Sequence, residues 1–183
     1  MTIIKKIKLH GFKSFAKSTE LIFGNDFNVV LGPNGSGKSN IMDALCFVLG
    51  KSSAKGMRAE KSANLIYNGG KVGKPAKEAL VSIFFDNSKK EFPIQDKIMK
   101  LTRTVKNSGL STYRINDKVR TRQQVLDLLS ASKIDPDGHN ITLQGDIAHF
   151  IEMPPKEKRE IIEEIAGISI YEDKKLKALN ELE

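Results

Sequence analysis

Residues 27–50, FNVVLGPNGSGKSNIMDALCFVLG, decide the fold of this chain. The first five residues are apolar apart from one asparagine and include two adjacent valines, which predicts a buried central strand over Phe27–Leu31. Gly32–Ser39 then satisfies the pattern G-x-x-x-x-G-K-[ST] in every fixed position. A helix is predicted next, because apolar residues recur at i, i+3, i+4, i+7 and i+8 from Ile41 and Gly50 ends the pattern.

A strand, a glycine-rich loop and a helix in this order predict a phosphate-binding P-loop. Gly35 and Gly37 allow the backbone to wrap closely around phosphate oxygens, which a Cβ atom would block. Backbone N–H groups and the helix N-terminus then point at the anion. We expect Lys38 to reach the β- and γ-phosphates of ATP, and the Ser39 hydroxyl to ligate Mg²⁺. The expected nucleotide-binding residues of this segment are Gly32, Pro33, Asn34, Gly35, Ser36, Gly37, Lys38, Ser39 and Asn40.

Further strands and helices are predicted on both sides of this segment. The strands are expected over residues 3–9, 20–23, 79–85, 98–105, 112–115 and 141–144. Asn116-Asp117 is a candidate hairpin turn, and Thr121 is a candidate N-cap of a helix. Pro154 and Pro155 stand at the start of a helix that continues to Ile165. Residues 51–77 predict a long loop that could hold one short helix, and loops of this length tend to be functional.

The composition is that of one soluble domain of 183 residues with a formal net charge of +8. No apolar run is long enough to span a bilayer, and the N-terminus does not resemble a signal peptide. The single cysteine, Cys46, excludes an internal disulfide and indicates the reducing cytosol. The positive charge suits DNA as well as it suits a solvated lysine-rich surface. Without tryptophan we expect contacts to the DNA backbone and no base readout.

Two features favour an ABC-type ATPase among P-loop proteins: the position of Asn34 in the loop, and Gln144 at the end of a predicted strand. A glutamine there can contact Mg²⁺ and orient the attacking water. Hydrolysis in this class also needs a Walker B aspartate followed by an acid, and a signature helix written L-S-G-G. Asp86 ends an apolar strand, but Asn87 follows where the acid belongs, and residues 129–132 lack the signature glycines. We therefore expect only the first half of a hydrolysis site.

Four segments together resemble the N-terminal half of the ATPase head of SMC (structural maintenance of chromosomes) proteins, most closely the bacterial and archaeal type. They are GFKSF at 11–15, GPNGSGKSNIMDAL at 32–45, QGDI from 144, and the run from Met153 to Glu172. The resemblance implies an α/β fold. The implied fold is that of a P-loop NTPase, one lobe of an ABC-type ATPase head. Its sheet would be mixed, with an antiparallel N-terminal part, and a C-terminal helix would begin a coiled coil. The lobe would occupy residues 1–166, and the truncated start of the coiled-coil arm residues 167–183.

The resemblance also implies partners. In SMC proteins a C-terminal lobe of the same protein carries the signature and Walker B motifs, and two complete heads sandwich two ATP molecules. Hydrolysis then drives DNA entrapment, chromosome condensation and segregation. The expected partners are that lobe, a second head in an ATP-dependent homodimer, a kleisin subunit at the neck helix from Tyr171, and double-stranded DNA without sequence preference. The protein is expected to be cytoplasmic and nucleoid-associated, with no membrane partner. The chain alone should bind ATP but hydrolyse almost none.

Further roles follow from the resemblance by position. Arg58 lies in the loop where the family has an arginine near the nucleotide, linked to DNA-stimulated hydrolysis, although a surface arginine is an equal explanation. Lys13 and Ser14 lie where the family's N-terminal segment approaches the base and ribose, although Lys13 also suits a basic strand edge. Lys38, Gln144 and Arg58 are thus the expected catalytic residues, and Ser39 and Gln144 the expected Mg²⁺ ligands.

Three other functions stay open at this point. A related DNA-repair ATPase would share the P-loop and the glutamine, but such proteins usually lack the segments at 11–15 and 164–168 together. A small-molecule kinase would need lid arginines on helices after the P-loop, where this chain has a glycine- and lysine-rich loop. A basic DNA-binding module with a structural P-loop is disfavoured by the intact Lys38 and Ser39.

Overall fold

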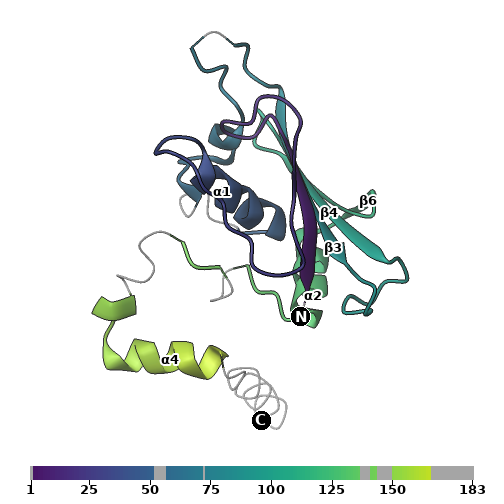
Figure 1. Cartoon of the computed structure of the whole chain (residues 1–183), viewed down its shortest axis with the longest axis vertical. Coiled ribbons are helices and arrows are strands. Elements are labelled where there is room, and N and C mark those ends of the chain that lie inside the picture. The colour runs from purple at the N-terminus through teal and green to yellow at the C-terminus, as the bar shows by residue number, and fades with distance from the viewer. Residues whose placement is uncertain (1, 52–56, 72, 137–140, 144–149, 166–183) are drawn as a thin grey trace, which may run out of the picture. The chain divides into compact units, whose positions relative to one another are not determined.

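The computed structural model describes residues 2–51, 57–71, 73–136, 141–143 and 150–165. They fall into two compact units, Met1–Asn140 and Ile141–Glu183. The first unit contains the sheet and the P-loop helix, and the second contains a helix over Pro155–Ile165 and a short helical stretch at residues 150–152 (Figure 1). The boundary expected at 166/167 and the expected coiled-coil start lie outside the described residues.

The first unit is built on a six-stranded sheet in the order β2-β1-β3-β4-β5-β6. Every neighbouring pair of strands is antiparallel. The strands are β1 (Ile3–His10), β2 (Thr19–Ile22), β3 (Glu78–Asp86), β4 (Ile98–Lys106), β5 (Ser111–Ile115) and β6 (Lys118–Arg120). The first five confirm the strands expected over residues 3–9, 20–23, 79–85, 98–105 and 112–115. The hairpin turn is also confirmed, since Asn116 and Asp117 have positive φ angles of 45° and 66° between β5 and β6.

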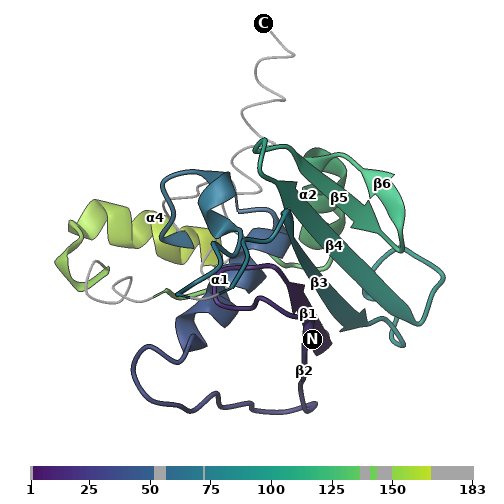
Figure 2. The ribbon, with the colours of Figure 1, turned by 90° about the horizontal axis from the view of Figure 1, so that it is seen from above.

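One face of the sheet is covered by helices and holds the core. Ala79, Val81, Ile83 and Phe85 alternate along β3 and are all buried. Helix α1 (Lys38–Leu49) packs on β3 and β4, α2 (Arg122–Ala131) packs on β5, and the two helices contact each other, so they lie on the same face (Figure 2). Thr121 caps α2 as expected: its hydroxyl accepts a hydrogen bond from the Gln124 N–H, and the Gln124 side-chain oxygen accepts one from the Thr121 N–H.

The buried face of α1 is wider than the apolar spacing predicted. Ile41 and Leu45 are only half-buried, whereas Asp43 and Phe47 are enclosed. The reason is tertiary: the Phe12 ring packs against Phe47, with ring centroids 5.4 Å apart, so the segment after β1 covers a side of α1 that the sheet does not. Gly50 ends the helix as expected, with a φ of 104°.

The buried central strand expected at Phe27–Leu31 is not formed. These residues have no regular structure, and none of the strand pairs in the described part of the chain includes them. Phe27 is 92% exposed and Leu31 86% exposed. An apolar strand is stable only where neighbouring strands satisfy its N–H and C=O groups, and in the described residues the sheet leaves this segment outside. The sheet is therefore antiparallel in these residues, and not mixed as expected.

The remaining expectations concern the loop after α1 and the second unit. Within the described part of residues 51–77 lies one short 3-10 helix, η2 (Ser62–Leu65). Residues 141–143 have no regular structure, so the strand expected there is not seen. Helix α4 (Pro155–Ile165) begins at the second proline, as predicted. No helix among the described residues is both long enough and apolar enough to cross a membrane.

The C-terminal end of α1 is held by a buried arginine of β4. Arg103 is 7% exposed, and its guanidinium donates hydrogen bonds to the carbonyl oxygens of Phe47 and Lys51 and to the Ser111 hydroxyl. Its Cζ atom lies 4.3 Å from the centroid of the Phe47 ring and 4.8 Å from that of Tyr113. A cation at this end satisfies the last carbonyls of the helix and complements its dipole.

Replacing Arg103 with methionine should lower the free energy of unfolding by about 2–4 kcal/mol, because buried carbonyls lose their donor. Urea denaturation of the chain measures the difference. The matched control is Arg120→Met on the exposed strand β6, for which we expect a change within about 0.5 kcal/mol. Equal stability of the two variants would show that the buried guanidinium does not anchor α1.

Candidate functional site

The P-loop turns over two glycines in left-handed conformation. Gly35 has a φ of 79° and Gly37 a φ of 95°, values that residues with a side chain rarely adopt. Gly37 is the N-cap of α1, and no side chain caps the helix. The Asn40 N–H donates to the Gly37 carbonyl oxygen, so the N–H groups of Lys38 and Ser39 are the ones that an added acceptor could reach. Within the loop, Lys38 Nζ donates to the carbonyl oxygens of Gly32 (2.6 Å) and Pro33 (2.8 Å). The ammonium group thus lies over the P-loop, where it is expected to contact the phosphates.

The segment after β1 lies against the P-loop. Asn40 Nδ2 donates to Ser14 Oγ at 2.9 Å. A Cβ atom on Gly37 would lie 2.9 Å from the same hydroxyl oxygen, so only glycine fits beside Ser14. The structure therefore brings Ser14, Gly37 and Asn40 together, as the prediction of a shared nucleotide site requires.

Gly11 fixes where this segment leaves the sheet. It has a φ of 61°, and a Cβ atom there would overlap the Glu78 carbonyl oxygen. The Gly11 carbonyl accepts a hydrogen bond from the Tyr67 N–H, and the Lys13 N–H donates to the Leu65 carbonyl. The turn after β1 is thereby tied to residues 65–67, which belong to the long loop after α1.

Lys13 and Arg58 meet on one buried carboxylate. Asp43 Oδ2 accepts from Lys13 Nζ and from Arg58 Nη2, both at 2.5 Å. Lys13 Nζ also donates to the Met57 carbonyl at 2.6 Å. The Asp43 side chain is 3% exposed and that of Lys13 12%, whereas that of Arg58 is 49% exposed. Arg58 therefore lies at the mouth of this cluster and Lys13 inside it.

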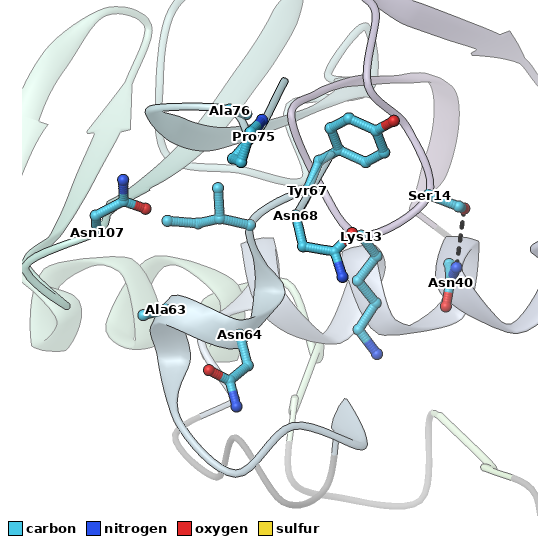
Figure 3. A pocket seen from close by; sticks show the side chains of 11 residues that line it. Lys13, Ser14, Asn40, Ala63, Asn64, Tyr67, Asn68, Pro75, Ala76 and Asn107 are labelled. Carbon is cyan, nitrogen blue, oxygen red and sulfur yellow. Dashed lines mark hydrogen bonds between the residues drawn. The ribbon is translucent and has the colours of Figure 1, made fainter. Parts of the chain in front are cut away.

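A cavity of about 610 Å³ adjoins the P-loop helix. Figure 3 shows Ser14 and Asn40 facing each other at one side of it, with the amides of Asn64 and Asn68 and the Tyr67 ring among the other lining groups. Lys13 also lines it. Amide, hydroxyl and ring groups in one cavity of this size suit a heterocyclic base and its ribose.

Most of the predicted site residues are therefore brought together at one end of the sheet. Gln144, the expected Mg²⁺ ligand and water-orienting residue, lies outside the described residues. In the described part of the chain no three His, Cys, Asp or Glu residues cluster to hold a metal. The sequence did not single out Asp43, Asn64 or Tyr67. The one available signal was the Asp43 carboxylate within the otherwise apolar run of residues 41–49.

Asp86 lies at the end of β3 that is far from the site. Glu78, which touches Gly11, is at the other end of the strand, on the order of 25 Å away at about 3.3 Å per residue. The Ser88 hydroxyl and backbone N–H, and then Lys5, hold the pKa of the Asp86 carboxyl at about 2. The Ser88 N–H is 2.8 Å from Asp86 Oδ1 and Lys5 Nζ is 3.1 Å from Oδ2. Asn87 is 2% exposed and bonds to the loop that follows it. These contacts give Asp86 a structural explanation, in agreement with its rejection as a Walker B residue.

Since the folded-state pKa of Asp86 lies below the ordinary value of 3.8, its ion pair and hydrogen bonds stabilise the fold above that pH. The contribution is lost as the pH falls through about 2. The Asp86 carboxyl carbon should titrate in NMR spectra with a midpoint near 2, and Ser88→Ala should raise that midpoint. A midpoint near 4 in the unaltered chain would contradict the assignment. Asp86→Asn should leave nucleotide affinity unchanged.

Comparison with known proteins agrees with this geometry. The family model described as RecF/RecN/SMC N terminal domain matches residues 3–153. The chromosome partition protein Smc of Pyrococcus furiosus is 48% identical over 183 residues, which are 100% of this chain and 16% of that protein. The Smc head domain of P. furiosus, solved with an extended coiled coil and bound to the C-terminal domain of ScpA, superposes with a TM-score of 0.90 at 48% identity. That match covers 100% of this chain and 46% of the solved one.

A second solved structure has nearly the same extent as this chain. It comes from a study of ATP-driven dimerization and DNA-stimulated activation of SMC ATPases, and it matches with a TM-score of 0.85 at 46% identity. The match covers 89% of this chain and 99% of the solved one. The chain thus spans about a sixth of the length of the curated relative and the whole of a solved SMC chain. These matches show that the chain belongs to the RecF/RecN/SMC N terminal domain family and, within it, to the N-terminal half of the SMC head.

Proposed function

We propose that this chain is the ATP- and Mg²⁺-binding N-terminal half of an SMC ATPase head. With its C-terminal lobe it dimerises around ATP and hydrolyses it, to drive DNA entrapment and chromosome condensation and segregation. The observation that carries the proposal is the P-loop, with both glycines in left-handed conformation and Lys38 folded over it. The solved SMC ATPase to which the chain is similar, with its ATP-driven dimerization, supports the reaction class.

The residues present fit the phosphates of a nucleotide. A Cβ atom at Gly35 would meet nothing within 4 Å, so the loop has room for an anion beside that glycine. Lys38 would exchange its two carbonyl contacts for phosphate oxygens, which are stronger acceptors for a cation. Ser39, exposed in the first turn of α1, would hold Mg²⁺ together with Gln144. When bound, Mg²⁺ neutralises charge on the β- and γ-phosphates.

The base and ribose would occupy the adjoining cavity, next to Lys13 and Ser14. The hydrogen bond from Asn40 to Ser14 joins this cavity to the P-loop helix, which supports one continuous ligand site. Arg58, half exposed beside Asp43, would act on the nucleotide from the same side. Positioning and charge stabilisation by these groups are the contributions that phosphoryl transfer requires of a protein.

The C-terminal lobe of the same protein is the partner that the exposed segment 27–31 supports. This segment has the composition of a buried strand, yet Phe27 and Leu31 are almost fully exposed. Ile22, at the end of the edge strand β2, is 80% exposed. A second lobe that adds strands here would bury these side chains and satisfy the backbone of residues 27–31. The greater length of the relatives is consistent with such a lobe.

The other proposed partners are a second head, a kleisin subunit and DNA. Head dimerisation is proposed from the solved SMC ATPase, and a kleisin from the ScpA-bound head of P. furiosus. The kleisin would bind the neck helix in residues 167–183, the proposed start of the arm beyond the lobe at 1–166. The net charge of +8 supports backbone contacts to double-stranded DNA, which would weaken steeply with salt. Such a protein works in the cytoplasm, at the nucleoid.

The unaltered chain should bind Mg-ATP, and Lys38→Ala should abolish binding, because the β- and γ-phosphates lose their cation. Isothermal titration calorimetry measures both affinities. Lys17→Ala removes an exposed lysine outside the site and serves as the matched control, with unchanged affinity expected. Equal affinity of the Lys38→Ala chain and the unaltered chain would refute the role of Lys38.

Hydrolysis should appear only when the chain is mixed with the C-terminal lobe of the same protein, because that lobe brings the Walker B and signature groups. Steady-state phosphate release measures it for each part alone and for the mixture, with Lys38→Ala as the inactive control. Rapid hydrolysis by the chain alone would mean that it holds its own acid and water-orienting groups, and the proposal of a half-site would then be wrong.

A further inference from the structure

A buried carboxylate behind the proposed nucleotide site has a role that the P-loop motif does not give it. Asp43 lies on α1, five residues after Lys38 and thus roughly 7.5 Å further along the helix axis. Its side chain is 3% exposed and accepts from two cations, Lys13 and Arg58. The cations come from two different segments, the turn after β1 and the loop after α1. One oxygen, Oδ2, accepts from both.

We infer that Asp43 is a positioning residue: its buried carboxylate holds the Lys13 ammonium, whose side chain lines the cavity, and the Arg58 guanidinium beside it, ready for a phosphate-bearing nucleotide. This inference rests on the proposed function. Without the carboxylate, two cations that share one anchoring point would repel each other. With it, each is held in one place while the P-loop supplies the remaining contacts.

The two cations depend on Asp43 to different degrees. Lys13 has a second acceptor, the Met57 carbonyl at 2.6 Å, and its side chain is 12% exposed. Arg58 donates one hydrogen bond to Asp43 and no other within the described residues, and half of its side chain is exposed. A guanidinium has five N–H donors in a rigid fork. Asp43 therefore fixes the Arg58 side chain and leaves donors for a ligand.

The same cluster joins the two ends of the site. Met57 and Arg58 precede, in the same loop, the residues 63–64 and 66–68 that line the cavity. Both Lys13 and Arg58 have positive φ angles, 46° and 54°, which non-glycine residues adopt only where contacts hold them. Asp43 supplies such contacts from the P-loop helix. A single carboxylate thus connects the phosphate end of the site with the wall of the cavity.

The test is a double-mutant cycle on Mg-ATP affinity, measured by calorimetry on the whole chain. Asp43→Asn keeps the shape and one acceptor but removes the charge. It should weaken binding about tenfold, because Arg58 must then be ordered when the nucleotide binds. Arg58→Gln should cost about the same. The double variant should bind no more weakly than Arg58→Gln alone, since there is then no guanidinium left to position and Lys13 keeps the Met57 carbonyl as its acceptor.

Val48→Ala is the matched control, because Val48 is also buried on α1 but outside the cluster. It should lower the melting temperature and leave Mg-ATP affinity unchanged, alone and combined with Arg58→Gln. The Arg58 side chain is half exposed, so Arg58→Lys should not disturb the fold; it keeps the positive charge but lacks the planar guanidinium. It should lose nearly as much affinity as Arg58→Gln, whether or not Asp43→Asn folds.

The outcomes separate the two proposals. Full affinity in Asp43→Asn, strictly additive losses in the double variant, or full affinity in Arg58→Lys would each overturn the positioning role while the proposed function stands. Asp43→Asn that behaves like Val48→Ala would show that Asp43 serves only the fold. No Mg-ATP binding by the unaltered chain would overturn the proposed function and, with it, this inference.

Discussion

The packing around Phe47 is the contact on which the rest of the structure depends. Its ring packs against the Phe12 ring and the Arg103 guanidinium, and its carbonyl accepts a hydrogen bond from that guanidinium. One residue of α1 thus contacts the turn after β1 and strand β4 in the centre of the sheet, through its ring and its backbone carbonyl. Because the P-loop enters the N-terminus of the same helix, the position of the loop relative to the sheet is set by this contact.

The site forms because α1 is packed on two sides by different parts of the chain. The sheet covers one side of the helix, and residues 11–15 and 57–68 cover another. Polar groups of the second cover face α1 where the helix begins: Ser14 meets Asn40, and Lys13 meets Asp43 one turn later. A rigid helix with chemically different neighbours along its first turns is a suitable scaffold for a ligand with an anionic end and an aromatic end.

Local signals in the sequence were enough for most of the elements, whereas contacts between residues far apart in the sequence decided the site and one expected strand. Alternating residues in β1 and β3, the Asn116-Asp117 turn and the Thr121 cap each act within a few residues, and each was predicted. Asp43 was missed because its partners lie 30 and 15 residues away. The segment 27–31 was predicted as a strand because its composition is that of one, but pairing depends on strands that the described sheet does not offer.

That unpaired segment has a consequence for how such a chain behaves while it is made and stored. An apolar, β-prone stretch that pairs with no strand in the described part of the chain is a template for pairing with any other chain that carries the same stretch. Two copies of this unit could therefore join edge to edge through residues 22–31 before a proper partner covers them. During synthesis from the N-terminus, the exposed interval lasts as long as the ribosome needs to make whatever covers it. A longer interval gives chaperones more work and aggregation more time.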